Sequence, residues 1–210
     1  QTMIDNVKKL YELSQKESRL ILGLMSGTSL DGLDIALCRI YHSGLDTKLD
    51  LLHFTTIPYD SHFKNELLSI CFKESLETEK FCLLHSYIGS LHASLINKTI
   101  DDWNIKSTDI DLIASHGQTL FHAPKSKHLR ESFDNSTFQM GDGDQIAVKT
   151  GIITISDFRQ KHIAAGGEGA PLATYGDYLL FSDVNRSRIL LNIGGIANIT
   201  FISADSKFEH

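Results

Sequence analysis

The sequence has 210 residues, 41% of them hydrophobic and 22% charged, proportions typical of a globular chain and not of a disordered one. The formal net charge of -6 argues against a nucleic-acid binder held by bulk positive charge, and no apolar run approaches the roughly 20 residues of a membrane helix. Three cysteines without CxxC spacing, and no apolar core for a secretory signal in residues 1–17, lead us to expect reduced thiols in a cytoplasmic protein.

The first sixty residues predict one helix and three strands. Residues 1–19 have the apolar stripe of a short charged helix, for which we expect a packing role only. Apolar runs at 20–25 and 33–40 flank a small polar segment, a pattern typical of a strand, a tight loop and a strand. Residues 49–57 are rich in apolar and β-branched side chains and predict a third strand, which Pro58 would close.

Two helices are expected next. Residues 63–72 form a short segment with apolar residues on one side. Residues 79–103 show apolar side chains at three- and four-residue steps behind Thr78, a suitable N-cap. We interpret His85 and His92 on the longer helix as surface or core polar residues and not as metal ligands, because no third ligand lies at a convincing spacing.

The rest of the sequence alternates short apolar runs with polar turns. Residues 110–114 and 152–155 predict strands buried in the interior of a sheet. We expect a polar loop at residues 125–136, a glycine turn at 141–144 and a helix at 145–150. A glycine-rich loop at 164–171 leads to a helix at 171–181 with Pro171 in its first turn, and a glycine hairpin follows at 188–202. Strands that alternate with helices indicate an α/β fold.

Residues 27–32 (GTSLDG) are the first candidate for chemistry. Glycines let backbone N–H groups approach an anion closely, and Thr28 and Ser29 add hydroxyl donors. Asp31 and Asp34 have the oxygen ligands that Mg²⁺ prefers. The same residue types also dominate ordinary polar turns, so the pattern alone leaves both interpretations open. The segment is not a Walker loop, because no Gly-Lys-[Ser/Thr] follows at the required spacing.

Residues 192–198 (NIGGIAN) are the second candidate. Gly194 and Gly195 lie between apolar strands and permit close approach to a phosphate, although a plain Gly-Gly hairpin turn explains them as well. Two such turns in one chain favour a paired phosphate clamp. The hairpins near residues 27 and 194 are also similar in plan, as the related halves of a two-lobed fold would be.

Asp157 follows the second buried strand, at the kind of strand end where open α/β sheets bind ligands. A carboxylate there can act as a general base. From position alone, an Asp that caps a turn or pairs with Arg159 is a slightly better interpretation.

Gln118 and His116 follow the other buried strand. Gln118 can hydrogen-bond sugar hydroxyls through its donor and its acceptor, and His116 is either an acid–base group or a satisfied core histidine. A triad of Ser115 or Ser29 with His116 and Asp157 is conceivable. Without a G-x-S-x-G elbow, however, we do not expect a hydrolase.

Taken together, six motifs resemble those of the anhydro-N-acetylmuramic acid kinase family. They are GLMSGTSLDGLDIA at residues 23–36, SHGQT at 115–119, GD at 141–142, SDFR at 156–159, IAAGGEGAP at 163–171 and NIGGIAN at 192–198. Each motif alone is modest evidence. Six of them in the family's order, across most of residues 20–202, are highly specific.

The resemblance implies an actin/sugar-kinase/Hsp70 type of fold, in which two lobes surround an ATP cleft. Residues 1–187 would form an N-terminal, ribonuclease H-like α/β lobe with a mixed central sheet flanked by helices, and residues 1–19 would be its helical extension. Residues 188–210 would be the opening β-hairpin of a second lobe, whose remainder lies outside this sequence.

The resemblance also implies an activity: the ATP- and Mg²⁺-dependent conversion of 1,6-anhydro-N-acetylmuramic acid to N-acetylmuramic acid 6-phosphate, in cell-wall recycling. It assigns catalysis to Asp157 and places Gln118, Arg159 and Gly169 at the sugar. Metal contact falls to Asp31 or Asp34. The ATP phosphates would be bound by Gly27, Thr28, Ser29, Leu30, Asp31, Gly32, Leu33, Asp34, Gly194 and Gly195. No nucleic acid or membrane is expected as a partner.

Three alternatives stay open. They are a non-catalytic lobe that binds a sugar or a partner, a kinase whose C-terminal lobe is a separate chain, and a kinase for another anhydro-sugar. A homodimer is also left open. Because the resemblance places the adenosine pocket in the second lobe, we do not assume that residues 1–210 are active on their own.

Overall fold

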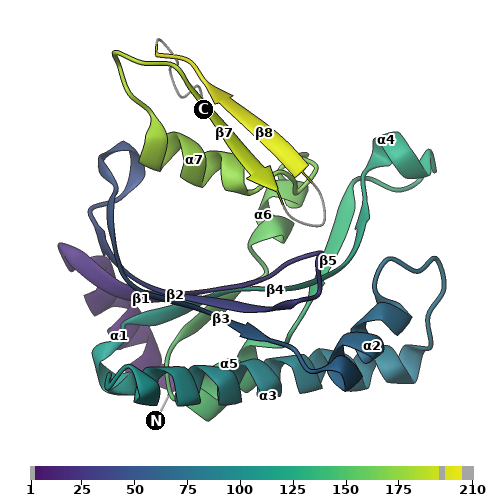
Figure 1. Ribbon diagram of the computed structural model, residues 1–210, viewed down its shortest axis with the longest axis horizontal. Helices are drawn as coiled ribbons and strands as arrows, with labels where there is room; N and C mark the ends of the chain where they lie inside the picture. The colour runs from purple at the N-terminus through teal and green to yellow at the C-terminus, as the bar shows by residue number, and fades with distance from the viewer. Residues whose placement is uncertain (1–2, 194–196, 205–210) are drawn as a thin grey trace.

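The computed structural model describes residues 3–193 and 197–204. Its centre is a six-stranded mixed sheet in the order β3-β2-β1-β4-β5, with β6 paired to β4 (Figure 1). A separate two-stranded sheet consists of β7 and β8. The strands are β1 (Ser18–Ser26), β2 (Gly32–Tyr41), β3 (Lys48–Pro58), β4 (Leu112–Ala123), β5 (Ser136–Met140), β6 (Thr154–Ser156), β7 (Arg188–Ile193) and β8 (Ala197–Ile202).

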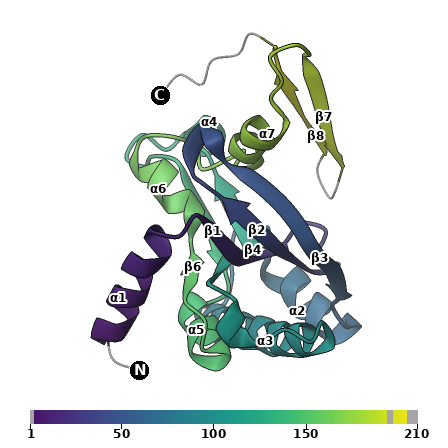
Figure 2. The same ribbon diagram turned by 90° about the vertical axis from the view of Figure 1, so that its left-hand side faces the viewer.

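Helices α3 and α5 lie on one side of the large sheet, and α7 and the β7–β8 hairpin lie on the other (Figures 1 and 2). The helices are α1 (Met3–Ser14), α2 (Ser61–Ile70), α3 (Thr78–Asp102), α4 (Lys125–His128), α5 (Gly143–Thr150), α6 (Phe158–Ala164) and α7 (Ala173–Phe181). The predicted α/β class, with a mixed central sheet flanked by helices, is confirmed.

The main core explains why β1 and β2 form. Leu33, Ile35 and Leu37 alternate along β2 and are buried against Ile96 of α3. The residues between them face the other side of the sheet, as the two-residue period of a strand requires. A second core around Leu67 of α2 joins that helix to α3 and to β4 and β5.

Several elements differ from the expectation. Strand β4 continues through residues 115–123, because this segment pairs with β5. Strand β5 itself was not expected, since it follows a polar segment. Helix α6 was not expected, since none of its residues is buried. The residue at the N-cap of α3 is Glu77 and not Thr78, and Ile155 of β6 is exposed instead of buried.

Two smaller differences concern the segments expected at 125–136 and 171–181. The first contains the short helix α4. The second begins its helix at Ala173, so Pro171 precedes the first turn. Within the described part of the chain, no helix is long and apolar enough to cross a membrane.

Candidate active site

Three parallel strands, β1, β4 and β6, run toward one edge of the large sheet, where β1 and β6 end and β4 continues to Ala123. Leu24 of β1 pairs with Ser115 of β4, and Ser115 pairs with Ser156 of β6. The segments that follow β1 and β6 therefore leave the sheet side by side, with β4 between them. At 4.7–4.9 Å per strand spacing, their starting points lie about 10 Å apart. The register thus brings Asp157 to the same edge as the predicted glycine loop, where α/β sheets bind ligands.

The glycine loop, residues 27–31, is a tight turn with free amides. Leu30 N–H donates to Gly27 O at 3.3 Å, which closes the turn. Leu30 has a φ of 55°, and its buried side chain anchors this strained conformation in the second core. The backbone N–H groups of Thr28 and Ser29 donate to no protein acceptor among the described residues. A turn of this kind offers donors to an anion.

Asp31 and Asp34 lie differently although both are near this turn. Asp31 is exposed, and the hydrogen bond from Ser29 Oγ, at 2.6 Å, lowers the pKa of its carboxyl group. Asp34 accepts a hydrogen bond from Thr56 Oγ1 of β3, at 2.6 Å. Within the described ranges, no three metal-ligating side chains converge. Asp31 is the more exposed of the two, and its oxygens fit a Mg²⁺ ion held mainly by phosphates and water.

Three of the residues assigned to ATP are buried. Leu30 and Leu33 pack in the two cores, and Gly32 is buried where β2 passes β3. A Cβ atom on Gly32 would lie 2.5 Å from Ile57 O, so this glycine is needed for packing. Contact between these three residues and ATP stays a prediction, and it would have to involve their backbone.

Gln118 connects the glycine loop to the buried end of β1 through two side-chain hydrogen bonds. Its side chain is 0% exposed; Oε1 accepts from Ser26 Oγ at 2.5 Å, and Nε2 donates to Gly27 O at 3.1 Å. The expected contact between Gln118 and a sugar stays a prediction, and it would require the amide to leave these partners.

Asp157 begins the turn from β6 into α6. Its φ of 62° is left-handed, a conformation that Asp tolerates better than most residues. The side chain is exposed and makes no capping hydrogen bond, and it forms no ion pair with a described residue. Neither alternative considered above, a turn cap or a pair with Arg159, is therefore found here. The carboxylate is available to a ligand.

Arg159 is instead held by His116 and Gly169. Its Nε and Nη2 lie 3.1 and 2.8 Å from His116 Nε2, and Nη1 donates to Gly169 O at 2.7 Å. His116 Nδ1 bonds to Gly117 O at 2.8 Å, so Nδ1 carries the proton and Nε2 accepts. Burial, and then the nearby guanidinium, lower the pKa of His116. Two predicted sugar residues, Arg159 and Gly169, are thus brought together.

His116 and Ser115 point to opposite faces of β4, because neighbouring strand residues alternate. Ser115 Oγ is buried in the core and His116 is committed to Arg159. Ser115 and His116 therefore do not form a nucleophile–base pair.

Gly194 and Gly195 lie outside the described residues. Their flanking strands are described: Ile193 of β7 pairs with Ala197 of β8 in an antiparallel hairpin. The predicted role of the two glycines in phosphate binding stays a prediction.

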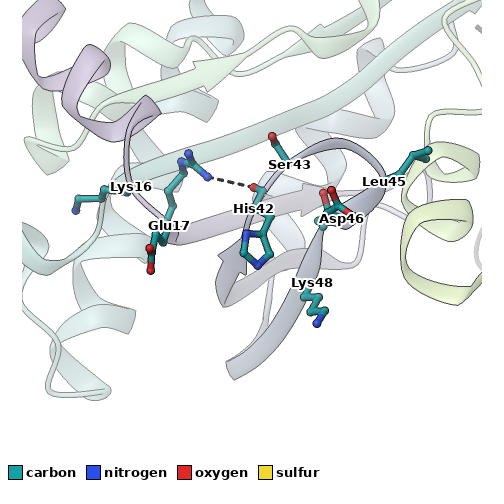
Figure 3. A pocket seen from close by; sticks show the side chains of 9 residues that line it. Lys16, Glu17, His42, Ser43, Leu45, Asp46 and Lys48 are labelled. Atoms are coloured by element: carbon teal, nitrogen blue, oxygen red, sulfur yellow. Dashed lines mark hydrogen bonds between the residues drawn. The ribbon is translucent and has the colours of Figure 1, made fainter.

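A hollow of about 620 Å³ lies at the opposite end of the sheet (Figure 3). It is lined by residues of the α1–β1 and β2–β3 connections, among them Lys16, His42 and Lys48. Arg19 there donates to the carbonyl oxygens of Leu13, Ser14 and His42 and fixes α1 to the sheet. We interpret this hollow as a junction between elements, since it holds none of the residues that converge at the other edge.

Residues 19–209 match the sequence profile of the anhydro-N-acetylmuramic acid kinase family. The chain belongs to this family. Proteins named anhydro-N-acetylmuramic acid kinase are similar to it: one from Pseudoalteromonas atlantica is 54% identical over 98% of this chain, one from Pseudoalteromonas translucida 54% over 95%, and one from Caldanaerobacter subterraneus 40% over 96%. These matches cover 52%, 50% and 51% of the relatives.

The chain thus spans about half the length of the curated relatives it matches. Its mixed sheet with flanking helices is the fold expected of an actin-like ATPase lobe in this family. Sequence analysis interpreted His92 as a surface or core polar residue but missed the hydrogen-bonded row that it forms with Tyr59 and Ser26 beside the glycine loop. Ser26 and His92 are buried and Tyr59 is partly buried. No local pattern joins them, because Ser26 ends β1, Tyr59 follows β3 and His92 lies on α3.

Proposed function

We propose that this protein is an ATP-dependent kinase that converts 1,6-anhydro-N-acetylmuramic acid to N-acetylmuramic acid 6-phosphate. The observation that carries the proposal is the free carboxylate of Asp157 at the sheet edge that also holds the glycine loop. The names of the relatives supply the substrate. A cytoplasmic location and a role in cell-wall recycling follow from the same family membership.

The substrate has no free 6-hydroxyl group, because O6 is bound to C1 in the anhydro bridge. Asp157 accepts a proton from a water molecule while the water oxygen forms a bond to C1. The C1–O6 bond breaks, and O6 bonds to the γ-phosphorus of ATP as the bond from that phosphorus to ADP breaks. Arg159, fixed by His116 and Gly169, lies two residues from Asp157 and offers a cation beside the sugar.

The phosphates of ATP need donors and a cation on the other side of the reaction. The free N–H groups of Thr28 and Ser29 supply the donors, as phosphoryl transfer requires. Mg²⁺, when bound, neutralises phosphate charge. Asp31 would hold it, directly or through water, while Asp34 is engaged by Thr56.

The resemblance implies a second lobe after the β7–β8 hairpin, and the relatives are about twice as long as this chain. Ile189, Leu191, Ile199 and Phe201 of this hairpin are each between 59% and 69% exposed. So much apolar surface favours a covering partner. We infer that the second lobe covers it, on the same chain or on a separate one, and completes the ATP site. A homodimer stays a prediction, and no observation favours a non-catalytic lobe.

Replacing Asp157 with Asn in the full chain tests the catalytic assignment. The amide keeps the size of the side chain but is no base, so turnover should fall by a factor on the order of 10²–10⁴. ADP release with ATP, Mg²⁺ and the anhydro-sugar measures this loss, and ATP affinity and thermal stability should stay unchanged.

Asp46→Asn is the matched control, because Asp46 is equally exposed but lies at the far end of the sheet. Near-normal turnover in Asp157→Asn would remove Asp157 from the role. A panel of other anhydro-sugars on the wild-type chain tests the substrate, and a higher kcat/KM for another sugar would replace the one proposed.

A further inference from the structure

We propose that Tyr59 and His92 are positioning residues for the glycine loop, acting through a buried hydrogen-bond chain that runs by way of Ser26 and Gln118 to Gly27 O. The inference rests on the proposed function only where it concerns ATP. Its geometric part concerns residues 27–31 themselves.

The chain has four links, each within hydrogen-bond distance. His92 Nε2 lies 2.9 Å from Tyr59 Oη, and Tyr59 Oη lies 2.7 Å from Ser26 Oγ. Ser26 Oγ donates to Gln118 Oε1 at 2.5 Å, and Gln118 Nε2 donates to Gly27 O at 3.1 Å. Ser26, His92 and Gln118 are all 0% exposed and Tyr59 is partly buried, so the Ser26–Gln118 link is shielded from water and the links at Tyr59 are partly shielded.

Only one assignment of donors and acceptors along this hydrogen-bond chain satisfies all four links. Gln118 Oε1 is an acceptor, so it takes the single hydroxyl hydrogen of Ser26. Tyr59 must then donate to Ser26 Oγ, and His92 Nε2 must donate to Tyr59. Every donor therefore points toward the glycine loop, and His92 is the neutral tautomer with its proton on Nε2.

The surroundings of His92 agree with this tautomer. Its Nδ1 is buried without a hydrogen-bond partner among the described residues. A Cβ atom placed on Gly141 would lie 4.0 Å from Nδ1 and 3.1 Å from a methyl group of Ile88, so this side of the ring is tightly packed. A proton on Nδ1 would find no acceptor there, and the ring stays neutral.

The end of the chain is the carbonyl that closes the loop. Gly27 O accepts from both Leu30 N–H and Gln118 Nε2, so the turn is tied to β4 as well as to itself. Removing the Tyr59 hydroxyl leaves Ser26 Oγ and His92 Nε2 without one buried partner each. The loop is then free to shift, and the amides of Thr28 and Ser29 lose their fixed direction.

Tyr59→Phe in the full chain is the main test, read by hydrogen–deuterium exchange without any ligand. Peptides covering residues 25–33 should exchange several-fold faster, and those covering α5 should not change. In turnover assays the KM for ATP should rise on the order of 5-fold, as expected if the displaced loop amides lose the equivalent of one hydrogen bond to the phosphates, with a smaller effect on the KM for the sugar. Tyr87→Phe is the matched control, because Tyr87, like Tyr59, packs its ring against Phe63 but takes no part in the hydrogen-bond chain.

His92→Leu and His92→Gln form a second pair that decides the matter if Tyr59→Phe does not fold. Glutamine can place an amide donor near the position of Nε2 and should restore slow exchange and a low KM for ATP, whereas leucine should not. The double variant with Tyr59→Phe and His92→Leu should exchange little faster in the glycine loop than either single variant, because both substitutions break the same hydrogen-bond chain.

Unchanged exchange in residues 25–33 for both Tyr59→Phe and His92→Leu would overturn the proposal. So would equal acceleration in α5, which would reveal a loss of global stability only. Faster loop exchange together with no effect of ATP on the wild-type loop would support the positioning role and contradict the proposed phosphate site.

Discussion

His92 is fully buried on α3, and its environment couples protein stability to pH. Burial lowers the pKa of this imidazole to about 4. The pKa of His116 is shifted in the same direction, chiefly by burial. In the unfolded chain both groups regain an ordinary pKa near 6.5. Between these values the unfolded state binds more protons than the folded state, so stability should fall as the pH is lowered.

We therefore expect the free energy of unfolding to decrease as the pH falls from about 6.5 to about 4, with an upper limit of about 3 kcal/mol from His92. Urea unfolding at a series of pH values measures this change. His92→Gln cannot titrate and should flatten the dependence. The same slope in His92→Gln and in the wild type would assign the effect to other groups.

An exposed candidate residue was easier to find in the sequence than a buried one. Asp157 stood out because it follows an apolar run that ends a strand. Tyr59 and His92 did not, because they lie 33 positions apart in the sequence and meet only through packing. Gln118 was noticed, but a single sequence could not reveal that its amide is engaged by Ser26 and Gly27.

At the scale of elements, the close approach of β2 and β3 depends on one glycine. A Cβ atom on Gly32 would lie 2.5 Å from Ile57 O and 3.1 Å from Pro58 Cα, both backbone atoms that cannot move aside alone. Gly32→Ala should therefore lower the free energy of unfolding by about 2 kcal/mol, through strain in the pairing of the two strands.

Chemical denaturation measures this loss, and Gly176→Ala on α7 is its control. A Cβ atom on Gly176 would meet nothing within 4 Å, and alanine favours a helix, so that variant should be unchanged or slightly more stable. Equal stability of Gly32→Ala and the wild type would show that β3 can move away at little cost.

The elements that sequence patterns predicted well are those with a regular apolar period. Strand β2 alternates Leu33, Ile35 and Leu37 on the core face, and α3 repeats apolar residues at helical steps. Strand β5 and the second half of β4 lack such a period, because their polar residues are buried by pairing with each other and with β1. Helix α6 buries none of its residues and so leaves no apolar signature.

At the scale of the whole molecule, the candidate site residues gather at one edge of the large sheet. Strands β1 and β6 end there on either side of β4, which continues to Ala123, and the glycine loop and Asp157 follow β1 and β6. The relatives are about twice as long as this chain, and the second lobe that we propose would cover the apolar β7–β8 hairpin. Our account places ATP on the loop and the anhydro-sugar near Asp157, so that phosphate transfer and bridge opening occur side by side.

The most direct test follows the bridging oxygen of the sugar. The anhydro-sugar is prepared with ¹⁸O in the C1–O6 bridge and treated with the full chain, ATP and Mg²⁺, and the product is analysed by mass spectrometry and ³¹P NMR. Our account predicts that the label remains on carbon 6 as the ester oxygen bound to phosphorus, with unlabelled solvent oxygen at C1. Label found at C1, or a phosphate ester on any oxygen other than the former bridge, would contradict it.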